Sequence, residues 1–594
     1  DSLQGNMRIT TNFTHTDRQA VYAHDANGEP YAIAITNATQ PGQSRVIEKG
    51  TKNEFYTVNL FSDYSRQLGD HYFKVMGGFN AEHQNVRTLS AQRDGIIVPD
   101  LPTIDTSTEQ DVAGGGYNHW ATAGFFGRLN YNYKEKYLLE VNGRYDGTSR
   151  FMKDQRWNFF PSFSLGWNVA RENFWKPLES VVNQFKLRGS WGELGNQNTS
   201  NLYPFYEILP VKSNSGNWLV NGGKTNTADI PSLVSTLLTW ERVRSFNVGF
   251  DFGAFSNRLT GSFDYFVRKT VDMVGPAPQL PLVLGIAPAI VNNADMKSYG
   301  FEIELSWRDR IGEVDYGVKF NLADAQQKVV KYPNTTNAFS DWYAGKMSGE
   351  IWGYTSLGIA KTDEEMKEHL ASLPNGGQNQ LGNKWGAGDI MYADINGDGK
   401  VDGGKGTLAD PGDQRIIGNS TPRYNFGLVL DASYKGFDVS IFFQGVGKRD
   451  YAPIVGTNGA VFWGAVNNIW QSMAMEEHFD YFRPEGHPMG ANLNGYYPRP
   501  DFTSNKNHQV QTRYLQDASY IRLKNLQIGY TLPKQWINKL HINRCRVYVS
   551  GDNLWTGTSL ASMFDPETLA AGDWGSGKTY PLSKVISFGL NVNF

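Results

Sequence analysis

Apolar and polar residues alternate one by one along the last nine residues of the chain. The apolar positions are Ile586, Phe588, Leu590, Val592 and Phe594, and the residues between them are Ser, Gly or Asn. Because successive side chains of a β-strand point to opposite sides, the segment is predicted to form a strand with one apolar and one small or polar face. Such a strand suits either a sheet edge in a soluble protein or a barrel wall in lipid, so other segments must decide.

The same alternation recurs along most of the chain, in pairs joined by short polar turns. One predicted hairpin has strands at 125–133 and 139–145 around Lys134-Glu135-Lys136, and another turns at Lys435-Gly436. Roughly sixteen to eighteen such segments of about 9 to 15 residues are expected, the length that a tilted strand needs to cross a bilayer. Further strands are predicted at 7–16, 163–169, 246–252, 259–268, 526–532 and 546–553, and further hairpins at 298–329 and 424–444.

Tight turns alternate with long connections, which are expected near 88–117, 194–237, 270–296, 331–349, 361–421, 448–518 and 556–581. Short turns on one rim and long loops on the other are typical of outer-membrane barrels. The predicted fold is therefore all-β: a transmembrane antiparallel β-barrel with short periplasmic turns and long extracellular loops. A large soluble sandwich or a propeller is the alternative, but a propeller needs a repeat of about 40 to 50 residues, which the sequence lacks.

Composition is compatible with this fold and excludes several functions. The 56 Lys and Arg nearly balance the 59 Asp and Glu, so no basic excess indicates a nucleic-acid partner. Cys545 is the only cysteine, which excludes intrachain disulfides and a cysteine-built zinc site. The low mean hydropathy of -0.47 is no objection, because alternating strands stay polar on one side.

The segment from Asp394 to Asp402 matches the loop of calcium-binding proteins. Oxygen-bearing side chains stand at loop positions 1, 3, 5 and 9, and Gly399 at position 6 permits the sharp turn. Position 12 is Lys405, so Asp413 is the candidate for the last carboxylate and Asp410 the second candidate. A structural calcium ion is expected to brace this long loop; magnesium, or an acidic loop without metal, are the alternatives. The predicted metal ligands are Asp394, Asn396, Asp398, the carbonyl of Lys400, Asp402 and Asp413.

Two further features of the sequence bear on catalysis, and neither predicts a catalytic site. Residues 572–579 match the formula of a phosphate-binding loop, but a strand follows instead of the required helix, so the segment is interpreted as a glycine-rich loop. The ten His residues show no zinc-protease spacing, and no Gly-x-Ser-x-Gly elbow is present. The chain is predicted not to be an enzyme.

Aromatic residues gather in the long loops, where they could stack on sugar rings or on peptide side chains. Small loop cores that only hold the loops together are the alternative explanation at each position. The candidate substrate contacts are Trp342, Tyr343, Trp463, Trp470, Tyr496 and Tyr497.

Several motifs, in order, resemble those of the SusC/RagA-type TonB-dependent transporters. They cover almost the whole chain: 127–133, 146–151, 240–241, 264–270, 299–304, 394–418, 520–533 and 550–554. The resemblance implies a 22-stranded barrel in the outer membrane of a Gram-negative bacterium, with an N-terminal plug domain inside it. It also implies import of oligosaccharides or peptides, driven by TonB, with a SusD-like surface lipoprotein as a lid, and it allows a dimer of such pairs.

The chain departs from this family pattern at its start, because neither a TonB box nor a plug precedes the first strand. Residues 1–594 are therefore expected to be the C-terminal barrel portion of a longer transporter, without the plug and the first strands. Two other functions remain open: a passive porin or adhesin, and a secreted carbohydrate-active enzyme in which the Asp394 loop is half of a dockerin. The second is disfavoured, since a dockerin needs two such loops flanked by helices.

Overall fold

The computed structural model describes residues 17–594 except residues 20, 25–29, 34–44, 99–100, 102, 110, 200, 277–282, 284, 287–288, 454–459, 465–473, 502–504, 539–540 and 570–578. The strand predicted at 7–16 and most of the glycine-rich loop at 572–579 lie outside these residues. The chain divides into two compact units. The first comprises Asp1–Leu165, Trp191–Arg244 and Val271–Asn293, and the second comprises Gly166–Ser190, Ser245–Thr270 and Ala294–Phe594.

Most of the ordered structure is one sixteen-stranded sheet, in agreement with the predicted number of strands. Its hydrogen-bonded order follows the sequence, with the small strands of the loops left out. The strands are β1 (Asp17–Gln19), β4 (Arg45–Leu68), β5 (His71–Asp94), β6 (Asp111–Tyr133), β7 (Tyr137–Thr148), β8 (Trp157–Asn168), β9 (Val182–Asn196), β14 (Glu241–Ala254), β15 (Leu259–Gly275), β16 (Val291–Ile311), β17 (Val314–Lys331), β22 (Arg423–Tyr434), β23 (Phe437–Lys448), β26 (Tyr520–Thr531), β27 (Arg544–Thr558) and β28 (Val585–Asn593).

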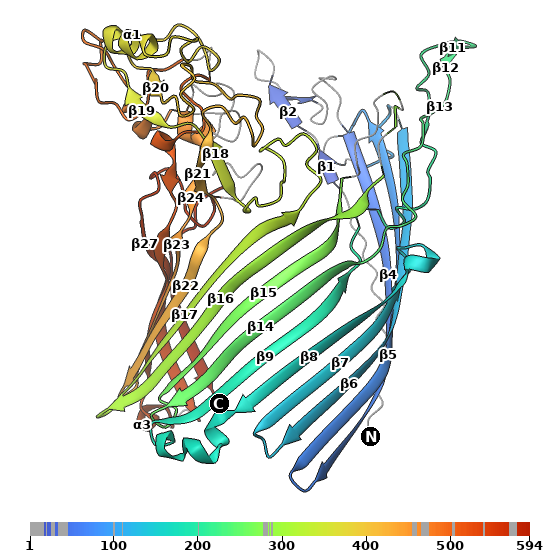
Figure 1. Ribbon diagram of the computed structural model, residues 1–594, viewed down its shortest axis with the longest axis vertical. Coiled ribbons are helices and arrows are strands. Elements are labelled where there is room, and N and C mark those ends of the chain that lie inside the picture. Colours follow the sequence, from blue (N-terminus) through green and yellow to red (C-terminus); the bar gives the residue numbers. More distant parts are fainter. Residues whose placement is uncertain are drawn as a thin grey trace. The chain divides into compact units, whose positions relative to one another are not determined.

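In the first unit, β4 to β7 lie side by side as long antiparallel hairpins (Figure 1). β4 and β5 have 24 residues each, more than the predicted 9 to 15. The predicted loop at 88–117 is wrong in its extent, since Thr88 to Ser90 pair with Gly116 to Gly114 and the connection is confined to 95–110. Glycine is unfavourable in strands because it has no side chain to pack, but the hydrogen bonds between neighbouring strands need only the backbone. The loop at 270–296 is likewise shorter, because β15 reaches Gly275 and β16 begins at Val291.

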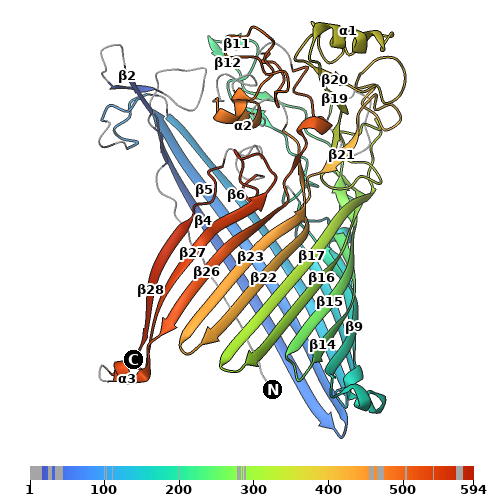
Figure 2. The same ribbon diagram turned by 90° about the vertical axis from the view of Figure 1, so that its left-hand side faces the viewer.

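In the second unit, Figure 2 shows β22, β23, β26, β27 and β28 side by side. The predicted turn at Lys435-Gly436 is confirmed: it joins β22 to β23, and both residues have positive φ angles of 47° and 92°. Such angles are accessible to Gly and suit a two-residue hairpin loop with the right-handed twist of the strands.

The apolar face of the closing strand β28 is not covered by a second layer of protein. Phe588 is 84% exposed and Leu590 62% exposed, and other strands of the sheet present further exposed apolar residues such as Phe159, Leu165 and Val248. In water this surface would be costly, but lipid solvates it. The exposure supports a membrane barrel over a sandwich with a dry interior.

The connections between the strands of the sheet carry the remaining elements. None of the helices among the described residues is long and apolar enough to cross a membrane. These elements are β2 (Val21–His24), β3 (Pro30–Ile33), β10 (Val211–Lys212), β11 (Leu219–Val220), β12 (Gly223–Lys224), β13 (Thr227–Ala228), β18 (Glu350–Gly353), β19 (Ser356–Ile359), β20 (Ile390–Tyr392), β21 (Arg415–Asn419), β24 (Asp450–Tyr451), β25 (Gln516–Asp517), α1 (Asp363–Ala371), α2 (Ala460–Trp463), α3 (Lys534–Ile537) and the 3-10 turns η1 (Lys153–Gln155), η2 (Val169–Arg171), η3 (Asn173–Leu178), η7 (Glu476–Phe479) and η8 (Thr512–Tyr514).

The largest buried hydrophobic cluster of the second unit lies in its loops and not under its strands. We call it the loop core. Its buried members come from connections far apart in the sequence: Tyr354, Leu373, Ile390, Tyr392, Val401, Phe462, Trp463, Tyr497, Tyr514, Ala518, Leu560, Phe564 and Leu569. The loops after β17, β23 and β27 therefore form a packed structure of their own. A barrel wall between lipid and lumen has no such interior.

Candidate functional sites

The polar face of the second unit carries an ion-pair ladder between neighbouring strands. Arg188 of β9 donates from Nη1 and Nη2 to Asp264 of β15 at 2.5 and 2.6 Å, and its Nη2 lies 3.0 Å from an oxygen of Asp251 on β14. One guanidinium thus joins two carboxylates across the sheet. Alternation along each strand puts these residues opposite the apolar face.

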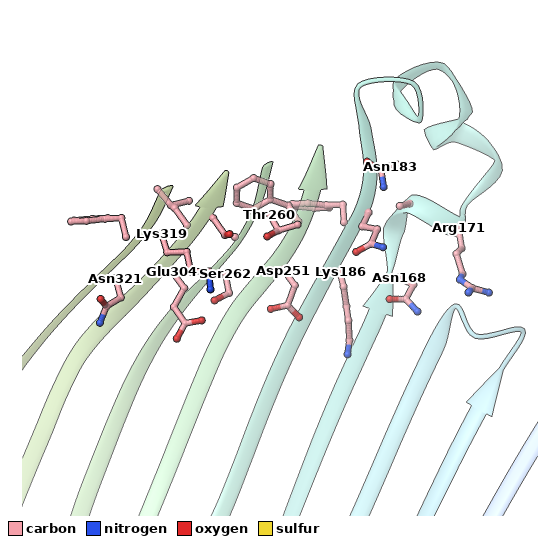
Figure 3. Close-up of a pocket in the computed structure, with 18 of the residues that line it drawn as sticks. Asn168, Arg171, Asn183, Lys186, Asp251, Thr260, Ser262, Glu304, Lys319 and Asn321 are labelled. Carbon is pink, nitrogen blue, oxygen red and sulfur yellow. The ribbon is translucent and has the colours of Figure 1, made fainter. Parts of the chain in front are cut away.

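A pocket of 810 Å³ opens on this polar face near the short-turn ends of the strands (Figure 3). Its lining combines amides, hydroxyls and charges of both signs with apolar side chains such as Phe252 and Leu305. Such a wall can bind a polar solute or a protein segment by hydrogen bonds and apolar contacts. The labelled residues of the pocket include Asn183, Lys186, Asp251, Ser262, Glu304 and Lys319.

A buried ionic network fixes the loop core. Asp389 is fully buried, and its carboxylate accepts hydrogen bonds from Arg499 at 2.8 and 2.7 Å and from Asn507 Nδ2 at 2.9 Å. Lys506 Nζ lies 2.9 Å from Asp389 and donates to the carbonyl of Lys384 at 3.0 Å. A buried charge is tolerated when it is paired and hydrogen-bonded, as it is here. The network ties 384–389 to 499–507, more than a hundred residues apart.

Tyr392 extends this network into the hydrophobic part of the loop core. Its hydroxyl donates to the carbonyl of Lys506 at 2.7 Å and accepts from Gln511 at 3.2 Å. Burial raises the pKa of the Tyr392 phenol well above its ordinary value, so the hydroxyl stays protonated and can serve as a donor.

Two of the candidate substrate contacts, Trp463 and Tyr497, belong to the loop core, with 2% and 7% exposure. They also line a second, mainly apolar pocket of 160 Å³ together with His508 and Arg499. Burial lowers the pKa of His508 to about 4, so its ring is neutral at pH 7. Sequence reasoning missed His508 and Arg499, because only aromatic residues were considered and no local pattern links them to Trp463.

The other aromatic candidates have different surroundings. Tyr496 packs against the loop core, and its hydroxyl accepts from Gln516 at 2.9 Å. Tyr343 donates to Glu350 at 2.6 Å, and burial raises its pKa to about 12. Trp342 is 40% exposed, whereas Trp470 lies outside the described residues. Substrate contact at all six residues stays a prediction.

The Asp394 loop has a closed conformation, and Asp413 lies against it. Asp394 Oδ2 accepts from the amide of Gly399 at 2.8 Å, so position 6 turns back to position 1. Asp413 is fully buried, and its carboxylate accepts from the amides of Ile395 at 2.7 Å and Asp402 at 2.8 Å. Burial raises the pKa of the Asp413 carboxyl, although these amides act in the opposite direction.

A positive charge already balances this acidic loop in the structure. Lys400 forms an ion pair with Asp402 and lies 3.8 Å from Asp398. Its hydrogen bond to Asp402 lowers the pKa of that carboxyl. Among the described residues, no group of three or more His, Cys, Asp or Glu side chains is arranged to hold a metal ion. The all-oxygen donor set nevertheless fits the preference of calcium.

Comparisons with known proteins agree with this architecture. A family model described as TonB dependent receptor-like, beta-barrel, matches residues 1–554. The chain is a member of this receptor family. TonB-dependent receptor P3 of Formosa agariphila is 28% identical over an alignment of 581 residues, which covers 91% of this chain and 52% of that protein. TonB-dependent receptor SusC of Bacteroides thetaiotaomicron is 24% identical over an alignment of 554 residues, which covers 91% of this chain and 50% of that protein.

Structural comparison shows the same fold. The structure of the RagAB peptide transporter matches with a TM-score of 0.73 at 21% identity, over 93% of this chain and 57% of that one. The expected SusC/RagA-type resemblance and the outer-membrane location are thereby confirmed. The relatives carry receptor names, which fits the expectation of a non-enzyme. The chain spans about half the length of the curated relatives that it matches.

Proposed function

We propose that this chain is the barrel of a TonB-dependent importer of large nutrients. The single observation that carries the proposal is the match of the TonB-dependent receptor barrel model to residues 1–554. In the complete transporter, a plug domain fills the barrel, and TonB moves the plug at the expense of the energised inner membrane. The chain itself makes and breaks no covalent bond.

The two polar sites have separate roles in this proposal. The strand face with the Arg188 ladder and the 810 Å³ pocket lines the lumen in this proposal. There it offers hydrogen-bonding partners to the plug and to the passing substrate. The loop core, held by Asp389 and Lys506, gives a rigid platform for a SusD-like surface lipoprotein that closes over the substrate. The substrate class is oligosaccharide or peptide, and either suits aromatic and polar loops.

We also propose that the Asp394 loop binds calcium as a structural ion. The spacing of its oxygen ligands and the position of Asp413 against the loop support this proposal. Binding requires Lys400 to leave Asp402, because its ammonium group and the ion would occupy the same negative region. Asp394, Asn396, Asp398, Asp402 and Asp413 would then hold the ion with the carbonyl of Lys400.

A comparison of uptake with and without TonB tests the transport proposal. Cells that produce the complete protein are given labelled oligosaccharides or peptides larger than the size limit of general porins. Uptake that disappears on deletion of TonB, while the protein level in the outer membrane stays the same, supports a gated importer. Uptake that persists without TonB identifies a passive porin and contradicts the proposal. Affinity purification from native membranes tests the lid: a surface lipoprotein is expected to copurify.

A further inference from the structure

Arg150 is a buried cation without a counter-charge among the described residues. Arg150 follows β7 in the sequence, and only 9% of the residue is exposed. No described carboxylate lies within ion-pair distance of its guanidinium group. Its Nε is buried and has no hydrogen-bond acceptor, while the guanidinium lies over the ring of Trp120 at 5.3 Å. Burial lowers the pKa of Arg150, as expected for a charge removed from water. A cation–π contact recovers only part of that cost.

The backbone holds Arg150 at this place. Ser149 N donates to the carbonyl of Ala121 at 2.9 Å, and Ala121 N donates to Ser149 Oγ at 3.0 Å, which extends the pairing of β6 and β7. On the other side, Phe151 is 1% exposed in a core cluster with Phe160, Leu238 and Trp240. These two anchored neighbours fix the backbone position of Arg150.

Trp120 places the site on the polar face of the sheet. The register between β5 and β6 is unbroken, so Trp120 lies on the same side as Arg128, eight residues further along β6. Trp120 Nε1 donates to Gln84 Oε1 at 2.6 Å. β6 and β7 are joined by the short turn at 134–136, so Arg150, beyond the far end of β7, is at the long-loop end.

Two other arginines of this face, Arg144 and Arg128, have partners. Arg144 donates to Asp146 at 3.0 and 2.9 Å, and Arg128 donates to Asn142 at 2.6 Å. Arg150 differs from both, because it is more buried and pairs with no carboxylate of the described residues. A buried charge with no counter-charge is strongly destabilising, whereas a paired one is tolerated.

We propose that Arg150 binds a carboxylate side chain of the plug domain, and that Trp120 forms the wall of this binding site. The inference rests on the plug of the proposed function. A substrate carboxylate is the weaker choice, because a resting transporter without substrate would leave the buried charge unpaired for most of the time. The curated relatives are long enough to contain such a plug domain, since about half of their length lies outside the match.

Site-specific cross-linking in the complete protein tests the proposal. A photo-cross-linking amino acid replaces Arg150 in one variant and Arg128 in a matched control, and cross-linked peptides are identified by mass spectrometry in the absence of substrate. A cross-link from position 150 to a plug peptide that contains Asp or Glu supports the proposal. Cross-links only within residues 1–594, or only to added substrate, overturn it. An intact mass without a plug would instead refute the proposed function.

Protease protection of the plug gives a second readout with natural amino acids. Loss of one partner of a buried charge pair typically raises the dissociation rate at least about tenfold. Arg150→Gln is therefore expected to speed plug cleavage about tenfold or more, and Arg150→Lys to restore part of the protection. Arg128→Gln should change the rate less than about twofold, since Arg128 is half-exposed and its pairing is weak. Equal rates for wild type and Arg150→Gln would contradict the proposal.

Discussion

Lys506 Nζ lies 2.9 Å from Asp389 Oδ2, and the two side chains are only 1% and 0% exposed. The pair joins two loop segments that are 117 residues apart in the sequence. Asp389 also binds Arg499 at 2.8 Å, whereas the distance from Lys506 Nζ to Asp501 is 3.9 Å. Removal of Asp389 therefore takes away the main counter-charge of Lys506, whereas removal of Lys506 leaves Asp389 paired with Arg499.

Removal of Asp389 is expected to destabilise the loop core more than removal of Lys506. Asp389→Asn leaves the buried ammonium without its main counter-charge, a change that costs about 3–5 kcal/mol. Lys506→Met leaves Asp389 paired with Arg499 and should cost less. Trypsin cleavage within residues 383–392, followed over time in detergent, measures local opening. Faster cleavage in Lys506→Met than in Asp389→Asn would contradict this order.

His508 should make the loop core less stable in mild acid. Its folded-state pKa of about 4 lies below the value of about 6.5 expected for an unfolded chain, so only the unfolded state takes up a proton between these values. Stability is then full above about pH 6.5 and falls as the pH decreases toward 4. The loss is about 2 kcal/mol between pH 7.5 and pH 5. Unfolding midpoints of wild type and His508→Gln at both pH values measure it.

The matched control for this prediction is His487→Gln, which changes a partly exposed His of the same connection. His508→Gln should show a smaller decrease in unfolding midpoint from pH 7.5 to 5 than wild type and the control. If all three proteins lose the same stability, the buried His508 is not the cause.

Calcium is expected to stabilise the Asp394 loop, and its removal to loosen it. A ligand at about 100 times its dissociation constant stabilises the folded state by about 2.7 kcal/mol. EGTA should therefore speed proteolysis within 394–413, and added calcium should reverse the effect. Asp413→Asn is expected to abolish the response, because it removes the buried carboxylate that lies against the loop.

Lys400→Met should tighten calcium binding, because it removes the ammonium that pairs with Asp402. Lys405→Met is the control, since Lys405 has no ion pair among the described residues. Calorimetric titration with calcium measures the affinity of both variants for the ion. Weaker binding in Lys400→Met would show that Lys400 belongs to the site and does not compete with the ion.

A charged substitution on the apolar face of β28 is expected to lower the free energy of unfolding, and one on the polar face to change it little. An arginine near the middle of the lipid-facing surface of a barrel costs about 2–4 kcal/mol. Phe588→Arg is expected to show a cost of this size, whereas Ser587→Arg, on the opposite face, should be close to neutral. Urea unfolding in lipid vesicles measures the difference. A similar small effect for both would contradict the orientation of the strand.

The sequence by itself determined the wall of the molecule. Alternation at period two, as in Ile586 to Phe594, fixes which side of each strand is apolar, and short turns such as Lys435-Gly436 fix antiparallel neighbours. These are local relations along one strand or one hairpin. The number of strands followed from them, and together with the long loops and the family resemblance they predicted the membrane location.

Only the tertiary structure decided what the long loops do. Asp389 and Lys506, or Trp463 and His508, meet through packing of segments that no local period relates, so the loop core was not predictable from the sequence. The same holds for Arg150, which has no counter-charge in the part of the chain that the structure describes: a sequence shows a charge, but burial and distance decide whether it is paired. The extent of the loop at 88–117 also depended on tertiary structure, because ladder pairing to β5 kept a glycine run extended.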